Sequence, residues 1–267
     1  MAFDFHKDKE VYFNIQTDNA NKYVLPFIEQ SLPITSSLRV LEVGCGEGGV
    51  LKAFLEKGCF GVGVELSLPR VELANVFLKE YIDQGKAQII GKNVYDIDVD
   101  KDFEDKFDLI VLKDVIEHIP DQEKIIQYFR SFLKEHGKIF FGFPPWQMPF
   151  GGHQQIVESK LLSKLPYYHL LPSPIYKFIL DRGNVSKGLV RELMDIKSTG
   201  ISLERFERIC KEQNYSVLEK THFFINPIYE YKFGLKPKKK IPILGDIPWL
   251  RNFVTTCGFY LVEKNKI

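Results

Sequence analysis

The chain contains the run Val40-Leu-Glu-Val-Gly-Cys-Gly-Glu-Gly-Gly49, in which an apolar segment passes directly into a glycine-rich loop. Glycine lets the backbone adopt left-handed conformations and approach a ligand closely. The residues after Gly49 have helical character, and the first turn of a helix presents unpaired amide groups to a ligand. The run therefore predicts a strand, a ligand-binding loop and a helix, the arrangement found at the carboxyl edge of a parallel sheet.

Similar apolar runs follow this loop and alternate with helical periodicity up to residue 145. The predicted strands are Arg39–Val43, Phe60–Val64, Ala87–Ile90, Phe107–Leu112 and Lys138–Phe143. The predicted helices between them are Val50–Lys57, Ser67–Ile82 and Asp121–His136. Because crossovers between parallel strands are right-handed, these helices must cover both faces of one sheet. The sequence therefore predicts an α/β fold.

Composition excludes several function classes. The chain has 267 residues, with 36 basic and 35 acidic, so its net charge of +1 gives no general attraction to nucleic acid. No run approaches the roughly 18 apolar residues of a membrane span, and the charged N-terminus does not resemble a signal peptide. We therefore expect a cytoplasmic protein without stable membrane insertion or nucleic-acid binding. The four cysteines lie at least 14 residues apart, so neither a disulfide framework nor a metal site is expected.

The glycine loop leaves two kinds of cofactor open. Gly44, Gly46 and Gly49 satisfy the pattern G-x-G-x-x-G, and Glu65 ends the second predicted strand about 20 residues later. This spacing is typical of a dinucleotide site, in which the acid binds ribose hydroxyls. The loop alone is consistent with an NAD(P)-dependent oxidoreductase and with an enzyme that uses another adenosine cofactor.

Three motifs resemble those of the class I S-adenosylmethionine-dependent methyltransferases. Glu42–Gly48 resembles their first motif, E/D-x-G-x-G-x-G, Val62–Glu65 their second-strand acid, and Phe107–His118 their fourth strand with its continuation. The resemblance covers roughly residues 36–146, 201–225 and 253–263. It implies a seven-stranded, mostly parallel sheet with helices on both faces and a C-terminal antiparallel hairpin. It also implies S-adenosyl-L-methionine as the cofactor.

The resemblance further implies roles for individual residues. The methionine part of the cofactor is expected at Glu42, Gly44, Cys45, Gly46 and Gly48. The ribose is expected at Glu65, the adenine at Leu66, Asn93 and Val94, and the sulfonium near the backbone of Leu112 and Lys113. Asn93 stands where the family often has an acid, and its amide oxygen can accept the same hydrogen bond. The N-terminal region of the family often closes over the cofactor, which makes Tyr12 and Gln16 candidates.

The alternation of strands and helices also divides the chain into segments. Residues 1–36 are predicted to form an N-terminal helical segment, and residues 37–146 with 201–267 the cofactor-binding domain. Residues 147–200 interrupt the alternation and are expected to form a helical lid over the substrate. A second insertion, 227–252, lies within the C-terminal hairpin and contains Lys236-Pro-Lys-Lys-Lys240, a composition typical of a solvated turn.

The acceptor is expected under this lid. Trp146 and Phe150 are predicted to line its pocket, because Phe143–His153 leaves the fifth predicted strand at the active edge of the sheet. His118, which starts a turn after the fourth predicted strand, is a further pocket candidate. His153 and Asp114 are candidate catalytic bases, since imidazole titrates near neutral pH and Asp114 lies where the methyl group should emerge. An ordinary role stays open for both histidines, in capping or packing for His118 and in an exposed loop for His153.

The predicted function is methyl transfer to oxygen or nitrogen of a small-molecule or saccharide acceptor. An enclosing aromatic lid favours a small molecule, and the neutral net charge disfavours RNA. Two alternatives stay open: the NAD(P)-dependent oxidoreductase, and a non-catalytic cofactor-binding or scaffold protein whose lid binds a partner. The oligomeric state is also left open.

Overall fold

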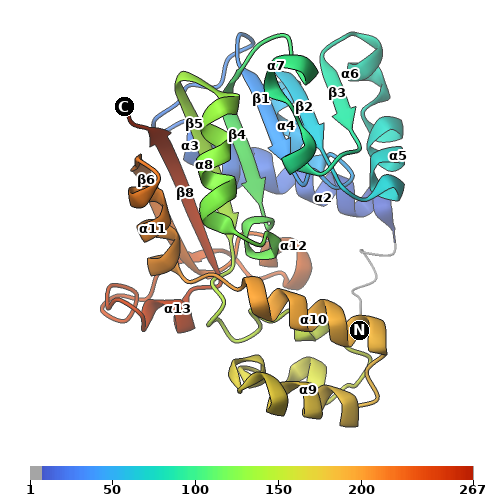
Figure 1. Cartoon of the computed structure of the whole chain (residues 1–267), viewed down its shortest axis with the longest axis vertical. Coiled ribbons are helices and arrows are strands. Elements are labelled where there is room, and N and C mark those ends of the chain that lie inside the picture. The colour runs from blue at the N-terminus through green and yellow to red at the C-terminus, as the bar shows by residue number, and fades with distance from the viewer. Residues whose placement is uncertain (1–7, 267) are drawn as a thin grey trace.

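The computed structural model describes residues 8–266, and one eight-stranded sheet runs through its centre (Figure 1). Its strands are β1 (Arg39–Val43), β2 (Phe60–Val64), β3 (Ala87–Ile90), β4 (Phe107–Lys113), β5 (Leu133–Phe143), β6 (Tyr215–Ile225), β7 (Lys238–Lys239) and β8 (Cys257–Lys264). The order is β3-β2-β1-β4-β5-β8-β6-β7, in which β1 to β5 are parallel and β8 is antiparallel to both of its neighbours. The predicted α/β class is confirmed.

The sheet has eight strands where seven were expected. The additional strand is β7, which pairs Lys239 with Phe223 and Lys238 with Ile225 at the edge of β6. The lysine run predicted to be a turn therefore contributes two residues to the sheet. Both lysines are exposed, and exposed lysines on a short edge strand discourage further strand pairing.

Helices cover both faces of the sheet. On one face, α7 (Val99–Asp102), α8 (Gln122–Phe132) and α11 (Leu203–Glu212) pack against the strands in the larger core. On the other face lie the π-helix η1 (Ala20–Val24), α3 (Leu25–Ile28) and α4 (Gly49–Glu56). Successive strand residues point to opposite faces, so Leu41 belongs to the first core and Val40 to the second. Near β3, α2 (Lys9–Asn19), α5 (Leu68–Phe77) and α6 (Lys79–Asp83) complete the cover.

Two helices end earlier than the sequence predicts. The helix predicted over Ser67–Ile82 is divided at Leu78 into α5 and α6, and the Ser67 side chain makes no capping hydrogen bond. The helix predicted over Asp121–His136 ends at Phe132, and β5 begins at the next residue. Leu133 is already paired with Phe107 of β4, so pairing with the neighbouring strand overrides the helical pattern there.

Residues 147–200 form a separate lobe beyond the carboxyl ends of the parallel strands (Figure 1). The lobe contains the 3₁₀ helices η4 (Gln154–Ile156), η5 (Leu162–Lys164) and η6 (Tyr168–Leu170), followed by α9 (Ser173–Arg182) and α10 (Lys187–Thr199). Buried side chains such as Tyr176 and Leu193 give the lobe its own apolar core. Two further 3₁₀ turns, η2 (Val94–Asp96) and η3 (Ile116–His118), follow β3 and β4.

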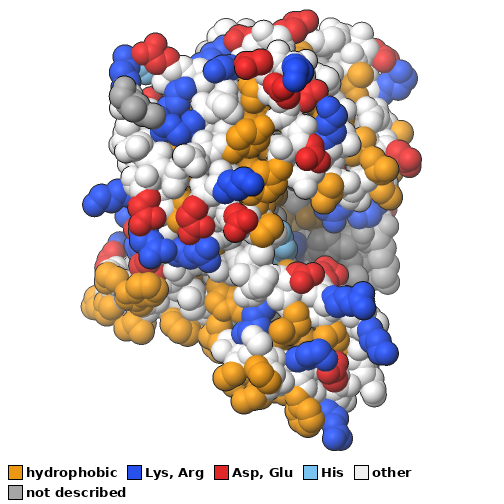
Figure 2. Space-filling model, viewed as in Figure 1, with side chains coloured by type: hydrophobic (Ala, Val, Ile, Leu, Met, Phe, Trp, Pro, Cys, Tyr) orange, Lys and Arg blue, Asp and Glu red, His pale blue; other side chains and the backbone are white. Residues whose placement is uncertain are grey.

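The second insertion adds α12 (Tyr229–Phe233), β7 and α13 (Arg251–Val254). It exposes large apolar side chains, including Ile243 at 76% and Trp249 at 63%, and apolar side chains gather along the lower part of the face in Figure 2. Within residues 8–266, every helix is too short or too polar to cross a membrane. Residues 1–7 of the predicted N-terminal segment lie outside the described chain.

Candidate functional site

The glycine loop joins β1 to α4 and is tied to the end of β2. The backbone amides of Gly44 and Cys45 both donate to the carbonyl of Val64, at 2.7 and 3.1 Å. Gly46 has φ +55°, and a Cβ atom there would meet only Arg70 Nη1, 4.0 Å away. The loop therefore leaves open space directly above Gly46, where a ligand can approach the backbone.

A hollow beside this loop collects residues from four separate parts of the chain. Its predicted members are Tyr12, Gln16, Glu42, Gly44, Cys45, Gly46, Lys113 and Asp114. Its wall also contains Phe13, Glu47 and Arg70, which were not predicted as site residues from the sequence. Arg70 lies in the first turn of α5, soon after Glu65. Its closeness in sequence to this predicted ribose-binding acid could have indicated that it lines the site.

Glu42 is the most unusual group in the wall of the hollow. Its side chain is buried, and among the described residues its Oε2 atom has no hydrogen-bond partner. Burial raises the pKa of Glu42 to about 8, although Lys113 and a backbone donor oppose the shift. A buried carboxyl with an unused oxygen is suited to a cationic or hydrogen-bond-donating group of a ligand.

Glu65 is also buried, and its carboxylate is held by backbone amides. Gly46 N donates to one oxygen at 2.9 Å, and Ser67 N donates to the other at 2.8 Å. Each carboxylate oxygen retains further lone pairs that can accept from hydroxyl groups. Glu65 therefore links the glycine loop to the end of β2, but it is not among the residues that line the hollow, and its ribose role stays a prediction.

The residues predicted for the adenine lie outside this hollow. Leu66 is 69% exposed, Val94 is buried in the core, and Asn93 Oδ1 accepts from Tyr95 N at 3.1 Å. The side chain of Leu112 is fully buried, so only its backbone can face a ligand. Gly48 has φ +88° and precedes α4; it lies between Glu47 and Gly49, which line the hollow, but is not itself a lining residue. Their cofactor roles stay predictions.

A charged pair forms the rim at the end of β4. Lys113 Nζ lies 2.6 Å from an Asp114 oxygen, with the lysine side chain buried and the aspartate partly exposed. Desolvation raises the pKa of Asp114, but Lys113 more than offsets this effect and holds it below its ordinary value. Tyr12 OH accepts from Gln16 Nε2 at 2.6 Å, and burial raises the pKa of this tyrosine. Asp114 is therefore an anion that the adjacent lysine orients.

Two histidines meet on the lobe side of this rim. The rings of His118 and His153 have centroids 4.9 Å apart, and Glu117 lies beside them. Burial lowers the pKa of His153 to about 4, and burial also lowers the pKa of His118. Both imidazoles are therefore neutral at pH 7. Glu117 lies in the Phe107–His118 motif, but no role was expected for it from the sequence.

The remaining predicted pocket residues occupy different surroundings. The ring of Trp146 packs edge-on against His169, whose Nε2 donates to the Trp146 carbonyl at 2.8 Å, so this tryptophan helps to anchor the lobe. Phe150 is partly exposed. A second hollow of about 540 Å³ lies between His118, Pro120 and the polar face of α10, where Arg191 and Asp195 line it. This hollow gives the acceptor side a polar wall.

Comparison with known proteins adds a family match. A family model described as a methyltransferase domain matches residues 16–163. The chain is 30% identical over 142 residues to the ubiquinone biosynthesis O-methyltransferase of Histophilus somni (strain 2336), covering 50% of this chain and 58% of that protein. It is 30% identical over 121 residues to the protein of the same name from Coxiella burnetii (strain RSA 493 / Nine Mile phase I), covering 45% and 49%. The chain thus spans about half the length of the curated relatives it matches.

Solved structures share the fold at low sequence identity. The plantazolicin methyltransferase in complex with a pentazolic analogue and SAH matches with a TM-score of 0.57 and 13% identity, covering 98% of this chain and 88% of that one. The magnesium protoporphyrin IX methyltransferase from Synechocystis PCC 6803 with bound SAH has a TM-score of 0.55 and 12% identity, covering 96% and 88%. These similarities confirm the architecture of the sheet and its helices.

Proposed function

This chain belongs to the class I S-adenosylmethionine-dependent methyltransferases, and we propose that it methylates a hydroxyl oxygen of a small molecule. The observation that carries the proposal is the rim at Lys113 and Asp114, which lies between the glycine-loop hollow and the histidine pair. A methyl group held in the hollow would therefore face the lobe. That the curated relatives are O-methyltransferases supports oxygen over nitrogen as the acceptor atom.

The residues of the hollow fit S-adenosylmethionine. When bound, this cofactor supplies a methyl group on a sulfonium whose leaving group is a neutral thioether, so alignment and desolvation are the main catalytic tasks. We assign Glu42 to the amino group of the methionine part, which would ionise this carboxyl on binding, and Arg70 to the carboxylate of that part, which has the opposite charge. Glu65 takes the ribose hydroxyls, and the backbone above Gly46 allows close approach.

The lobe encloses the acceptor in this proposal. Its loop brings His153 to the rim, and α10 forms one wall of the hollow beside His118. The hydroxyl oxygen would lie next to His153, which we assign to orienting it, and next to Asp114, which we assign to passing its proton to water. The charged side chains on α10 favour a polar small molecule, and a saccharide is a second acceptor of this chemistry.

A thermal-shift measurement followed by an activity assay tests the function. We expect S-adenosylhomocysteine to raise the melting temperature and NAD(P) to leave it unchanged, since a ligand stabilises only a fold that binds it. Methyl transfer is then measured on a panel of phenols, alcohols and amines. Stabilisation by NAD(P) alone would contradict the proposal, and transfer to amines only would replace oxygen by nitrogen.

Glu65→Ala should weaken cofactor binding about 10- to 150-fold, because hydrogen bonds to a charged acceptor contribute about 1.5 to 3 kcal/mol. The loss includes the anchoring of Gly46 N, which this carboxylate accepts. Calorimetry with S-adenosylhomocysteine measures the change. Glu72→Ala, which removes an exposed acid from the neighbouring helix, serves as the control and should bind normally. Unchanged affinity in Glu65→Ala would separate this residue from the site.

Cofactor binding should release protons at Glu42. Its carboxyl has a pKa of about 8 without ligand, so it is mostly protonated at pH 7, and an ammonium group bound against it lowers that pKa. Affinity should therefore rise with pH, by at most about tenfold per pH unit, and level off near pH 8. Calorimetry in buffers of different ionisation enthalpy should show release of up to about one proton at pH 7. Glu42→Gln should abolish the release, and heats that do not depend on the buffer would contradict the assignment.

A further inference from the structure

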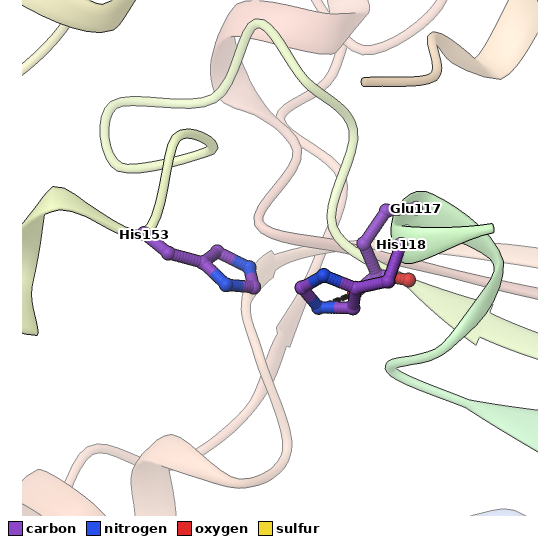
Figure 3. A group of neighbouring side chains, drawn as sticks. All are labelled: Glu117, His118 and His153. Atoms are coloured by element: carbon purple, nitrogen blue, oxygen red, sulfur yellow. Dashed lines mark ion pairs between the residues drawn. The ribbon is translucent and has the colours of Figure 1, made fainter. Parts of the chain in front are cut away.

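Glu117, His118 and His153 form a cluster with the composition of a metal site (Figure 3). The first two residues come from η3, directly after β4, and His153 comes from the lobe, 35 positions along the chain. One ligand atom from each residue lies within 4.8 Å of the others. Figure 3 shows the two imidazole rings facing each other across a gap, with the glutamate beside His118.

The carboxylate of Glu117 lacks the partners that a buried anion requires. Glu117 is 4% exposed, and neither carboxylate oxygen has a hydrogen-bond partner among residues 8–266. A charged group buried without hydrogen bonds or a counter-ion is costly. Glu117 Oε1 lies 4.0 Å from His118 Nε2, and the nearby ammonium group of Lys113 is paired with Asp114 at 2.6 Å. A bound cation would supply the missing partner.

The backbone on both sides of the cluster is fixed. Thr199 Oγ1, at the end of α10, donates to the carbonyl of Glu117 at 2.6 Å. Gln122 Nε2 donates to the carbonyls of Ile116 and Thr199, at 3.1 and 2.6 Å, and so ties η3 to the lobe. On the other side, His153 N donates to the carbonyl of Phe150 at 3.0 Å. These bonds hold the backbone of the three ligands on a shared frame.

The geometry points to a metal site, and we propose that Glu117, His118 and His153 bind one divalent transition-metal ion that holds the hydroxyl group of the acceptor. Two imidazoles and one carboxylate with open positions are a donor set of zinc and of non-haem iron, whereas magnesium prefers oxygen ligands alone. Ligand atoms about 2.1 Å from one ion lie about 3.4 Å apart, so the cluster must contract on binding. His118, whose side chain is 40% exposed, has room to move.

This proposal replaces the expectation from the sequence that no metal is bound. That expectation rested on the spacing of cysteines, whereas the proposed ligands are two histidines and a glutamate from different segments. The four cysteines are all buried and do not compete for the ion.

The metal would assist methyl transfer as a Lewis acid, and this part rests on the proposed function. A hydroxyl oxygen bound to the ion loses its proton to water more easily than a free hydroxyl does. That oxygen then forms a bond to the methyl carbon while the carbon–sulfur bond breaks, and the bonding pair stays on sulfur as a neutral thioether. The products are a methyl ether, the thioether and one proton, so charge and atoms balance.

Metal binding is tested on the full chain, without a histidine tag and after treatment with a chelator. Co²⁺ is titrated while its visible absorption is recorded, Zn²⁺ is then added in competition, and no acceptor is present. We expect one Co²⁺ per chain and displacement by Zn²⁺. Glu117→Gln and His153→Ala should each weaken binding by at least about 100-fold, since even an outer-shell partner is worth 10 to 100-fold. His136→Ala removes an exposed histidine from the far end of β5 and should bind Co²⁺ like the wild type.

Three results would overturn the metal proposal. These are failure of the wild type to bind Co²⁺, unchanged affinity in the Glu117 and His153 variants, and displacement of Co²⁺ by equimolar Mg²⁺. S-adenosylhomocysteine binding is measured on the same samples as a check of folding. A wild-type protein that binds Co²⁺ but not S-adenosylhomocysteine would contradict the proposed function and leave the metal site standing. Failure of the metal proposal and failure of the proposed function therefore give different results.

Discussion

Gly46→Val is expected to abolish binding of S-adenosylmethionine while the chain still folds. A Cβ atom at residue 46 would project into space bounded only by Arg70, 4.0 Å away, so the branched side chain would occupy the position of the ligand. The backbone at this residue has φ +55°, which a β-branched residue also disfavours. Calorimetry with S-adenosylhomocysteine measures the loss, and circular dichroism verifies the fold.

Gly85→Val is the matched control for this substitution. Gly85 has φ +68°, and a Cβ atom there would find no other atom within 4 Å, so this variant carries a similar backbone cost. It lies between α6 and β3, away from the lining residues of the hollow. We therefore expect normal ligand binding with a similar loss of stability. A folded Gly46→Val protein that binds the ligand like Gly85→Val would exclude the glycine loop from the site.

His153→Ala should lower turnover by about 10²- to 10⁴-fold once an acceptor is found, because the variant loses a side chain that orients the reacting hydroxyl. Its ring faces His118 on the lobe side of the rim, and it is not among the residues that line the cofactor hollow. We therefore expect little change in affinity for S-adenosylmethionine. Steady-state kinetics and calorimetry on the same preparation separate the two effects.

His136→Ala controls for the loss of a histidine, because His136 is exposed at the opposite end of β5. This variant should keep full turnover. A raised acceptor KM with nearly normal kcat in His153→Ala would make His153 a binding contact without a role in the chemical step. Full activity in that variant would place the imidazole outside the reaction.

Local sequence patterns predicted the centre of the fold. The bounds of β1, β2 and β3 agree with the apolar runs, because a glycine or a polar residue directly follows each strand and ends it locally. The glycine loop is similarly local, since positive φ at Gly44, Gly46 and Gly48 depends on residue type. Most residues that line the hollow beside the loop were expected from the family resemblance, including Glu42 next to the loop and Lys113 at the end of a strand.

Contacts between distant segments decided the rest. β5 begins at Leu133 because that residue pairs with Phe107, and β7 exists because two lysines pair with the edge of β6. Sequence periodicity reports propensity within one segment, and strand pairing can override it. Arg70 faces the hollow only because α5 packs beside the loop.

The cluster of Glu117, His118 and His153 shows the same division most clearly. Glu117 and His118 are adjacent in the sequence, so their proximity is local. His153 joins them only because the fold of the lobe brings it next to the end of β4. That path depends on hydrogen bonds such as the one from Thr199 to the Glu117 carbonyl, which joins residues 82 positions apart. Residue type and spacing determine a strand, a turn or a glycine loop, whereas only tertiary packing decides which side chains from different segments share one site.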